Sequence, residues 1–206
     1  MARTGDVIEH PVSGETMVFL QTGEDTSGQL LQVDLFVRPE SSPSGSQIHP
    51  HQEKRFVVKR GWMMLRVGGK LHVLGAGDEA IVSAGTPHIW WNCGFDEVNA
   101  ILELRPAGRY EEVVSTLFGL AKAGQVKGNG EPSFLQKAVT FEEYRDTIRL
   151  SEHEPIVQRI AVSALAVVGR TFGLRPDYPY PRSARVNGGL EIWRTEPTIS
   201  GSMILV

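Results

Sequence analysis

Between Val7 and Arg105, apolar and polar residues follow one another in short runs that are separated by Gly, Pro, Asp and Ser. Such runs are typical of the strands of a β-sandwich or barrel, and this half of the chain shows no helical periodicity. Gly68 and Gly69 indicate a tight hairpin, because glycine adopts the positive φ angles that two-residue loops require. We expect eight strands, at residues 17–21, 30–37, 54–59, 62–67, 70–74, 79–83, 88–92 and 98–104.

The pattern changes after Pro106, where apolar residues begin to recur three and four positions apart. This spacing predicts a helix over residues 110–121. Residues 134–150 predict a helix or a pair of helices. Residues 154–173 predict a further helix, with a proline in its first turn and a glycine past its end.

These patterns divide the chain into three regions. We expect a mainly β barrel over residues 1–106 and a helical extension over residues 107–180 that packs on the barrel. Residues 181–206 are rich in proline and glycine and predict an irregular tail. This tail is expected to wrap over the surface or to reach a neighbouring subunit.

Composition narrows the functions open to this chain. Its 206 residues are 41% hydrophobic and 22% charged, which suits one core, and its formal net charge is -3 without any run of Lys or Arg. We therefore expect no nucleic acid as a partner. No signal pattern and no long apolar stretch occur, so we expect no membrane partner and a cytoplasmic location. The single cysteine, Cys93, cannot form a disulfide within the chain and is expected to be a partly buried, inert thiol.

Two segments resemble a known family. "GDEAIVSAGTPHIWWN", residues 77–92, is similar to the second cupin motif and departs from it only at Ser83, where proline is usual. "QIHPHQEKRFVVKRG", residues 47–61, resembles the first cupin motif and precedes the second by a hairpin. The flanking segments resemble a bacterial subgroup of cupin-2 proteins that carry C-terminal helices. The resemblance implies a double-stranded β-helix barrel followed by α-helices, but cupins include dioxygenases, isomerases, decarboxylases and pure binding domains, so the fold leaves the activity open.

The second motif supplies one candidate metal ligand, His88. Strand alternation sends His88, Trp90 and Asn92 to one face, and the resemblance implies that this face lines the mouth of the barrel. The alternative is a structural histidine that bonds to the backbone. Trp90 is the expected pocket wall.

The first motif lacks its acidic ligand. Counting back from Gly61 places the motif glutamate at Lys54, on the inward face, because the opposite parity would bury Arg55 and Lys59 without partners. In this register the motif histidines fall on Gln47 and His49. His51 is then an extra residue, either a weak ligand or a solvated turn histidine.

A second register takes His49 and His51 as the motif pair, and the glutamate position then falls on Arg55 or Phe56. No register supplies the full set of ligands. The expected metal ligands are therefore His49, His51 and His88, and a divalent transition metal (Fe, Mn, Ni or Zn) is expected to be weakly bound or absent. The expected pocket residues share the inward face or the barrel mouth and are Gln47, His49, Lys54, Phe56, Val58, His88, Trp90 and Asn92.

The sequence thus favours a cupin-fold protein that binds a small, apolar or aromatic molecule and has a degenerate metal site, without catalysis or with weak metal dependence. The alternative is a metal-dependent enzyme of dioxygenase or isomerase type that acts on a small organic substrate. Lys54 separates the two, because a fixed cation among metal ligands opposes metal binding. No catalytic residue can be assigned. A Lys54 with a lowered pKa could also form a Schiff base, or it could pair with Glu103 or another barrel carboxylate.

The remaining candidates are expected to be structural. His10, His72 and His153 lie away from both motifs and are expected at the surface or at strand edges. Trp91 points outward by strand parity, and together with the apolar helices it predicts a homodimer.

Overall fold

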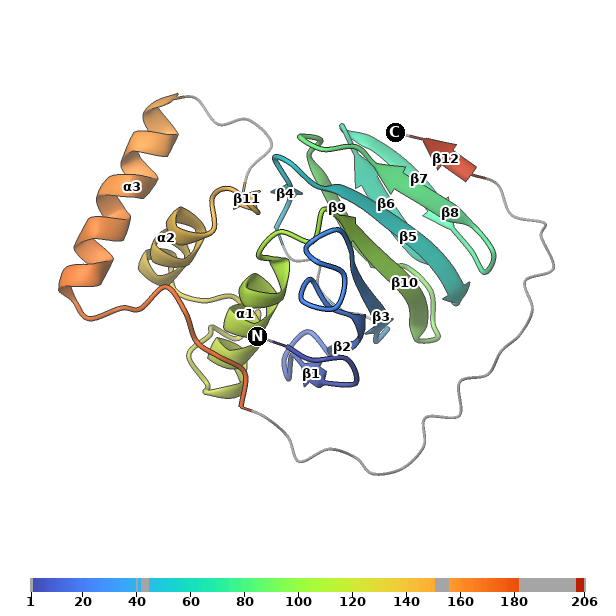
Figure 1. Cartoon of the computed structure of the whole chain (residues 1–206), viewed down its shortest axis with the longest axis horizontal. Coiled ribbons are helices and arrows are strands. Elements are labelled where there is room, and N and C mark those ends of the chain that lie inside the picture. The colour runs from blue at the N-terminus through green and yellow to red at the C-terminus, as the bar shows by residue number, and fades with distance from the viewer. Residues whose placement is uncertain (1, 40, 42–44, 151–155, 182–202, 206) are drawn as a thin grey trace.

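The computed structural model describes residues 2–39, 41, 45–150, 156–181 and 203–205. Two sheets face each other, with the helices gathered at one side of them (Figure 1). The larger sheet has the order β1(Val7–Glu9), β2(Glu15–Gln21), β3(Leu31–Val37), β10(Val98–Arg105), β5(Glu53–Arg60), β8(Glu79–Val82), β12(Met203–Leu205). The smaller sheet has the order β11(Arg149–Leu150), β4(Gln47–Ile48), β9(His88–Asn92), β6(Met63–Val67), β7(Lys70–Leu74). This mainly β architecture with C-terminal helices confirms the predicted fold class.

All eight predicted strands form, with ends within two residues of the predicted ones. The alternation did not predict the four short elements β1, β4, β11 and β12, which have two or three residues each. β12 falls within the segment predicted to be an irregular tail, and it pairs in parallel with β8. The rest of that tail, residues 182–202 and 206, lies outside the described residues.

The core lies between the two sheets. β5 shows the predicted parity: Phe56 and Val58 are buried inside, while Arg55 and Lys59 are on the outer face, where they pair with carboxylates. Gly61 ends this strand with a φ of +80°, and a Cβ there would lie 2.8 Å from the Glu97 carbonyl oxygen. Glycine is therefore required where the first motif ends.

The helices form a second layer on the barrel. α1(Tyr110–Lys122) packs directly on it, since Tyr110, Val114 and Phe118 belong to the barrel's own core cluster. α2(Phe134–Glu143) begins at Ser133, whose hydroxyl accepts a hydrogen bond from the Gln136 amide. α3(Ile156–Thr171) packs on α2, farthest from the barrel (Figure 1). The helices predicted over residues 110–121 and 154–173 are therefore present. The prediction over residues 134–150 is correct only for its first part, because α2 ends at Glu143 and residues 149–150 form β11.

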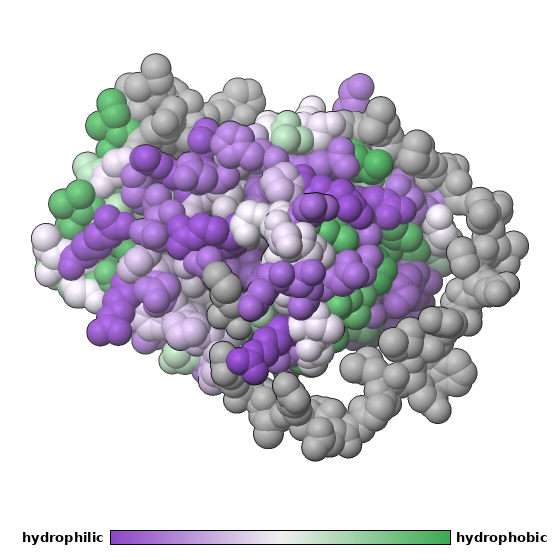
Figure 2. Space-filling view, viewed as in Figure 1, coloured by the Kyte–Doolittle hydropathy of each residue, from purple (hydrophilic) through white to green (hydrophobic). Residues whose placement is uncertain are grey.

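Some apolar side chains remain at the surface. Figure 2 shows hydrophobic residues along α3 at the left edge of the molecule, where Ile160 and Phe172 are exposed. Cys93 is also exposed, which corrects the prediction of a partly buried thiol. It follows the end of β9, and its thiol lies 3.4 Å from the Trp62 carbonyl oxygen. Trp91, on which the predicted homodimer rests, is half-buried, and the homodimer stays a prediction. No helix in the described ranges has the length and hydropathy that a membrane span needs.

Candidate functional site

A completely buried lysine lies at the mouth of the barrel. Lys54 is in β5, and its exposed fraction is 0%. Its Nζ lies 4.0 Å from the ring centre of Trp90, 4.9 Å from that of Tyr110 and 5.6 Å from that of Phe56. Polar contacts are long, at 3.5 Å to His49 Nε2 and 3.4 Å to the Tyr110 hydroxyl. We refer to Lys54 with these four neighbours as the lysine nest.

Two histidines flank the lysine nest, and backbone carbonyls orient both. His49 Nδ1 lies 2.8 Å from the Thr147 carbonyl oxygen, so Nδ1 donates and Nε2 is left as an acceptor toward Lys54. His88 Nδ1 lies 3.0 Å from the Thr86 carbonyl oxygen. Its Nε2 is buried and has no hydrogen-bond partner within the described residues. The centres of the His49 and His88 rings are 5.4 Å apart. They lie close together because β4 pairs with β9, which brings the two motifs side by side.

Burial drives this cluster toward its neutral forms. It lowers the pKa of Lys54 well below the usual value for lysine, and the negative charge of Glu15 opposes this shift. Burial also lowers the pKa of His49 well below its usual value, and the nearby Lys54 adds to the shift. For His88 the same two causes lower the pKa to about 3. The arrangement therefore favours a neutral amine that donates to the unprotonated Nε2 of His49.

Lys54 has no carboxylate within hydrogen-bonding distance among the described residues. The expectation that it pairs with Glu103 is wrong. Glu103 lies on the outer face, where its carboxylate accepts hydrogen bonds from Gln32 at 2.8 Å, Arg55 at 3.3 Å and Arg105 at 3.2 Å.

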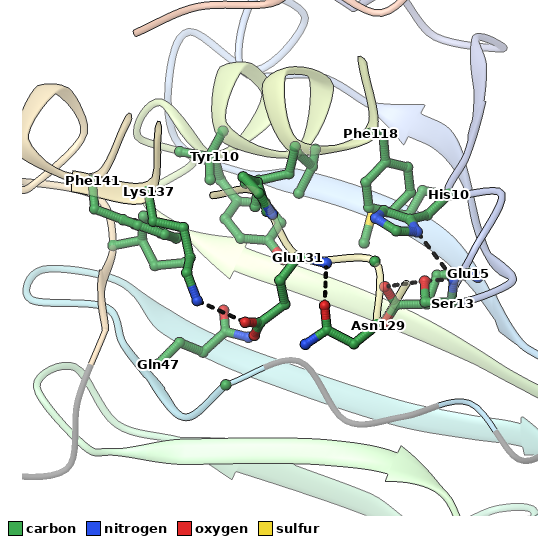
Figure 3. Close-up of a pocket in the computed structure, with 18 of the residues that line it drawn as sticks. His10, Ser13, Glu15, Gln47, Tyr110, Phe118, Asn129, Glu131, Lys137 and Phe141 are labelled. Carbon is green, nitrogen blue, oxygen red and sulfur yellow. Dashed lines mark hydrogen bonds and ion pairs between the residues drawn. The ribbon is translucent and has the colours of Figure 1, made fainter. Parts of the chain in front are cut away.

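A cavity of about 160 Å³ lies beside the lysine nest, between the barrel mouth and the helices (Figure 3). The barrel contributes Trp90, Gln47 and Met17, and α1 contributes Tyr110, Val114 and Phe118. Figure 3 shows Ser13 and Glu15 beside His10 at one end, and Gln47, Glu131 and Lys137 at the other. Lys54 does not line this cavity, because Trp90 and Tyr110 contact it and also form the cavity wall.

The predicted pocket residues separate into four groups. Gln47 and Trp90 line the cavity, while His49, Lys54 and His88 lie buried beside it. Phe56 and Val58 belong to the barrel core. Asn92 does not line the cavity, because its side-chain amide forms hydrogen bonds with the backbone. Nδ2 donates to the carbonyls of Val37 and Asp96, and Oδ1 accepts from the Gly94 amide. That residue holds the turn after β9.

The sequence reasoning missed several polar residues of the cavity. His10 was expected at the surface or at a strand edge, but it is 7% exposed, and its ring lies edge-on to Phe118 at 5.2 Å. Glu15 was missed because it precedes the predicted strand. It shares the face of Met17 and Phe19, so extending the period-two pattern by two residues would have placed it inward. His72 is half-buried in β7, and His153 lies outside the described residues.

Comparison with known proteins agrees with this architecture. Residues 35–102 match the family model of the cupin domain, which identifies this part of the chain as a cupin domain. A comparison with curated protein sequences finds no significant match.

Several solved structures are similar to part of this chain at low sequence identity. The cupin domain of a Schizosaccharomyces pombe protein is 13% identical with a TM-score of 0.41, over 45% of this chain and 64% of the other. A sugar phosphate isomerase of the cupin superfamily from Silicibacter pomeroyi is 19% identical with a TM-score of 0.40, over 46% and 60%. A predicted oxalate decarboxylase from Thermotoga maritima is 18% identical with a TM-score of 0.44, over 52% and 98%.

A divalent metal, which many cupins hold at this position, does not fit the residues present. His49 and His88 could each offer Nε2, but the Lys54 amine lies 3.5 Å from His49 Nε2 and its charge also acts on His88. The third predicted ligand, His51, is exposed. No group of three His, Cys, Asp or Glu side chains suited to a metal ion occurs in the part of the chain that the structure describes. Two imidazoles beside an amine, without a carboxylate, are a poor set for divalent transition ions.

Proposed function

We propose that this cupin is a metal-independent binding protein for a small, largely apolar organic molecule, which it holds in the cavity between the barrel mouth and α1. The observation that carries the proposal is the position of Lys54. The Lys54 amine lies at the position where the first motif has an acidic metal ligand. The ring of Trp90, whose centre is 4.0 Å from Lys54 Nζ, separates the amine from the cavity.

The lysine nest supports binding without a metal in two ways. A protonated Lys54 would repel a divalent ion, and a neutral Lys54 donates to His49 Nε2, which removes that lone pair from coordination. Two of the aromatic rings around the amine, those of Trp90 and Tyr110, also form part of the cavity wall. The lysine nest therefore supports one side of the proposed binding surface.

The cavity supports a small ligand. Its volume, about 160 Å³, is close to that of a cavity known to bind benzene, which is roughly 150 Å³. Most of its wall is apolar, from Met17, Val113, Val114, Leu117 and Phe118. A few polar groups at the two ends would orient the bound molecule, as in most ligand sites.

A binding experiment with metal-stripped protein tests this function. After treatment with EDTA, the protein is titrated with toluene and benzyl alcohol by calorimetry, and the thermal shift is measured at saturating probe. We expect binding of at least one probe, unchanged when Zn²⁺ or Mn²⁺ is restored. Leu117→Trp should abolish binding by filling the cavity, whereas the same substitution at exposed Leu71 should not. Binding that requires added metal, or no binding of either probe, would overturn the proposal.

A further inference from the structure

The ionisable groups that line the cavity are His10, Glu15, Tyr110, Glu131 and Lys137. Glu131 and Lys137 satisfy each other through an ion pair of 2.6 Å. His10 is neutral, because its Nδ1 accepts a hydrogen bond from the Ser13 amide at 3.1 Å and burial lowers its pKa. Burial raises the pKa of Tyr110, so its hydroxyl stays protonated.

Glu15 differs from these groups. Its one hydrogen bond in the described structure comes from the Ser13 hydroxyl, at 3.2 Å to Oε2, and no described Lys, Arg or His forms an ion pair with it. The backbone amide of Ser13 is already used by His10. No described residue donates a hydrogen bond to Glu15 Oε1, and Glu15 lines the cavity. Burial raises the pKa of Glu15, as expected for a carboxylate without a cation beside it.

Lys54 does not supply that cation. Its charge acts on Glu15 at a distance, but its polar contacts go to His49 and Tyr110, and burial favours its neutral form. No hydrogen bond or ion pair joins Lys54 to Glu15, whereas a cationic group bound in the cavity could contact this carboxylate directly, because Glu15 lines the cavity. It would also face the rings of Trp90, Tyr110 and Phe118, which suit both a cation and an apolar body.

Resting on the proposed function, we propose that the ligand is a small primary amine with an aromatic or branched apolar body, and that its ammonium group binds Glu15. The ammonium donates to the free Oε1, and the body fills the space between Trp90 and α1. The volume of about 160 Å³ limits the body to about the size of one benzene ring. The positive charge of the ligand thus compensates the carboxylate of Glu15, which has no ion-pair partner among the described residues.

Four probes of similar size and shape distinguish the effect of charge on binding from that of shape: benzylamine, benzyl alcohol, toluene and benzoate. Each is titrated into the wild-type full-length protein and into Glu15→Gln by calorimetry near pH 7.5. Glu9→Gln is the matched control, because Glu9 lies on the neighbouring strand β1 and pairs with Arg38 outside the cavity. A charge-assisted hydrogen bond should make benzylamine bind roughly tenfold more tightly than benzyl alcohol, with benzoate weakest.

Glu15→Gln should bring benzylamine down to the affinity of benzyl alcohol, while benzyl alcohol still binds, which also shows that the variant is folded. Glu9→Gln should keep the preference for the amine. Equal binding of amine and alcohol by the wild-type protein, tighter binding of benzoate, or a preference that survives in Glu15→Gln would overturn the amine proposal and leave small-molecule binding standing. Failure of all four probes to bind would overturn the proposed function itself.

Discussion

Lys54 and Arg55 are neighbours on β5, and their side chains lie in opposite electrostatic environments. Arg55 faces outward, where it donates to the two oxygens of Glu79 at 2.6 and 2.7 Å and to Glu103 at 3.3 Å. These carboxylates raise its pKa and keep it charged. Lys54 faces inward, with aromatic rings and a histidine nitrogen around it, and burial lowers its pKa.

The difference shows that Lys54, His49 and His88 on the inner face have no ion-pair partner among the residues that the structure describes. Aromatic rings stabilise a cation weakly compared with the cost of desolvating it, so the amine and both imidazoles shift toward neutrality. We expect such a face to oppose a metal ion and to exclude water from the wall of the cavity. The predictions below test this contrast between the inner and outer faces, from the largest expected effect to the smallest.

Acid should destabilise the protein through the inner face. Because the pKa of His88 is about 3 in the folded state, the unfolded chain, with its usual pKa near 6.5, binds the proton more tightly between these values. The free energy of unfolding should therefore fall as the pH drops from about 6.5 to about 3, by several kcal/mol for His49 and His88 together. Urea unfolding across this range measures the loss.

His88→Asn keeps a donor for the Thr86 carbonyl and removes the titrating group, so it should flatten the pH dependence. The matched control is His51→Asn, which changes an exposed histidine and should leave the slope as in the wild-type protein. An unchanged slope in His88→Asn would show that the inner face is not dry.

Replacing the buried amine should raise stability. Lys54→Met keeps the length of the side chain and removes the group that is costly to bury, so we expect a gain of about 1 to 2 kcal/mol in the free energy of unfolding at pH 7. The difference in the free energy of unfolding between the variant and the wild-type protein should shrink as the pH rises toward 10.5. In this range the unfolded wild-type chain still binds a proton at Lys54 and the folded protein does not, so a higher pH stabilises the wild-type protein. A Lys54→Met variant that loses more than about 1 kcal/mol would contradict the neutral lysine nest.

The outer face should respond weakly and depend on salt. Arg55→Ala removes the pair with Glu79, which is partly exposed, so the expected loss is about 1 kcal/mol or less. The loss should shrink in 1 M NaCl, because salt screens partly exposed charges. A double-mutant cycle with Glu79→Ala gives the coupling free energy directly, and a coupling above about 3 kcal/mol would place this pair in the class of buried ones.

Local patterns predicted the fold better than the site. Strand alternation placed Lys54, Phe56 and Val58 on one face, and the same rule applied to residues 15–21 would have found Glu15. The alternation carries no information on which helix closes the barrel mouth. Tyr110 entered the prediction only as a member of an apolar helical stripe, and Phe118 was not singled out. The contact of Phe118 with His10, and the position of Tyr110 beside Trp90 in the cavity wall, depend on how α1 packs. The same limit explains why Asn92 was expected in the pocket, although its partners come from β3 and from the turn after β9.

The central claim, that Lys54 occupies the position of an acidic metal ligand and makes the site independent of metal, is tested most directly by metal binding. The wild-type protein, Lys54→Glu and Lys59→Glu are compared by elemental analysis after dialysis and by titration with Zn²⁺ and Mn²⁺. Lys59→Glu is the control, because it reverses the charge of an exposed lysine on the same strand. We predict less than one ion per chain in the wild-type protein and in Lys59→Glu. In Lys54→Glu we predict affinity at least about a hundredfold higher, because a carboxylate joins His49 and His88. One tightly held ion per wild-type chain, or a folded Lys54→Glu variant with no gain in affinity, would contradict the claim.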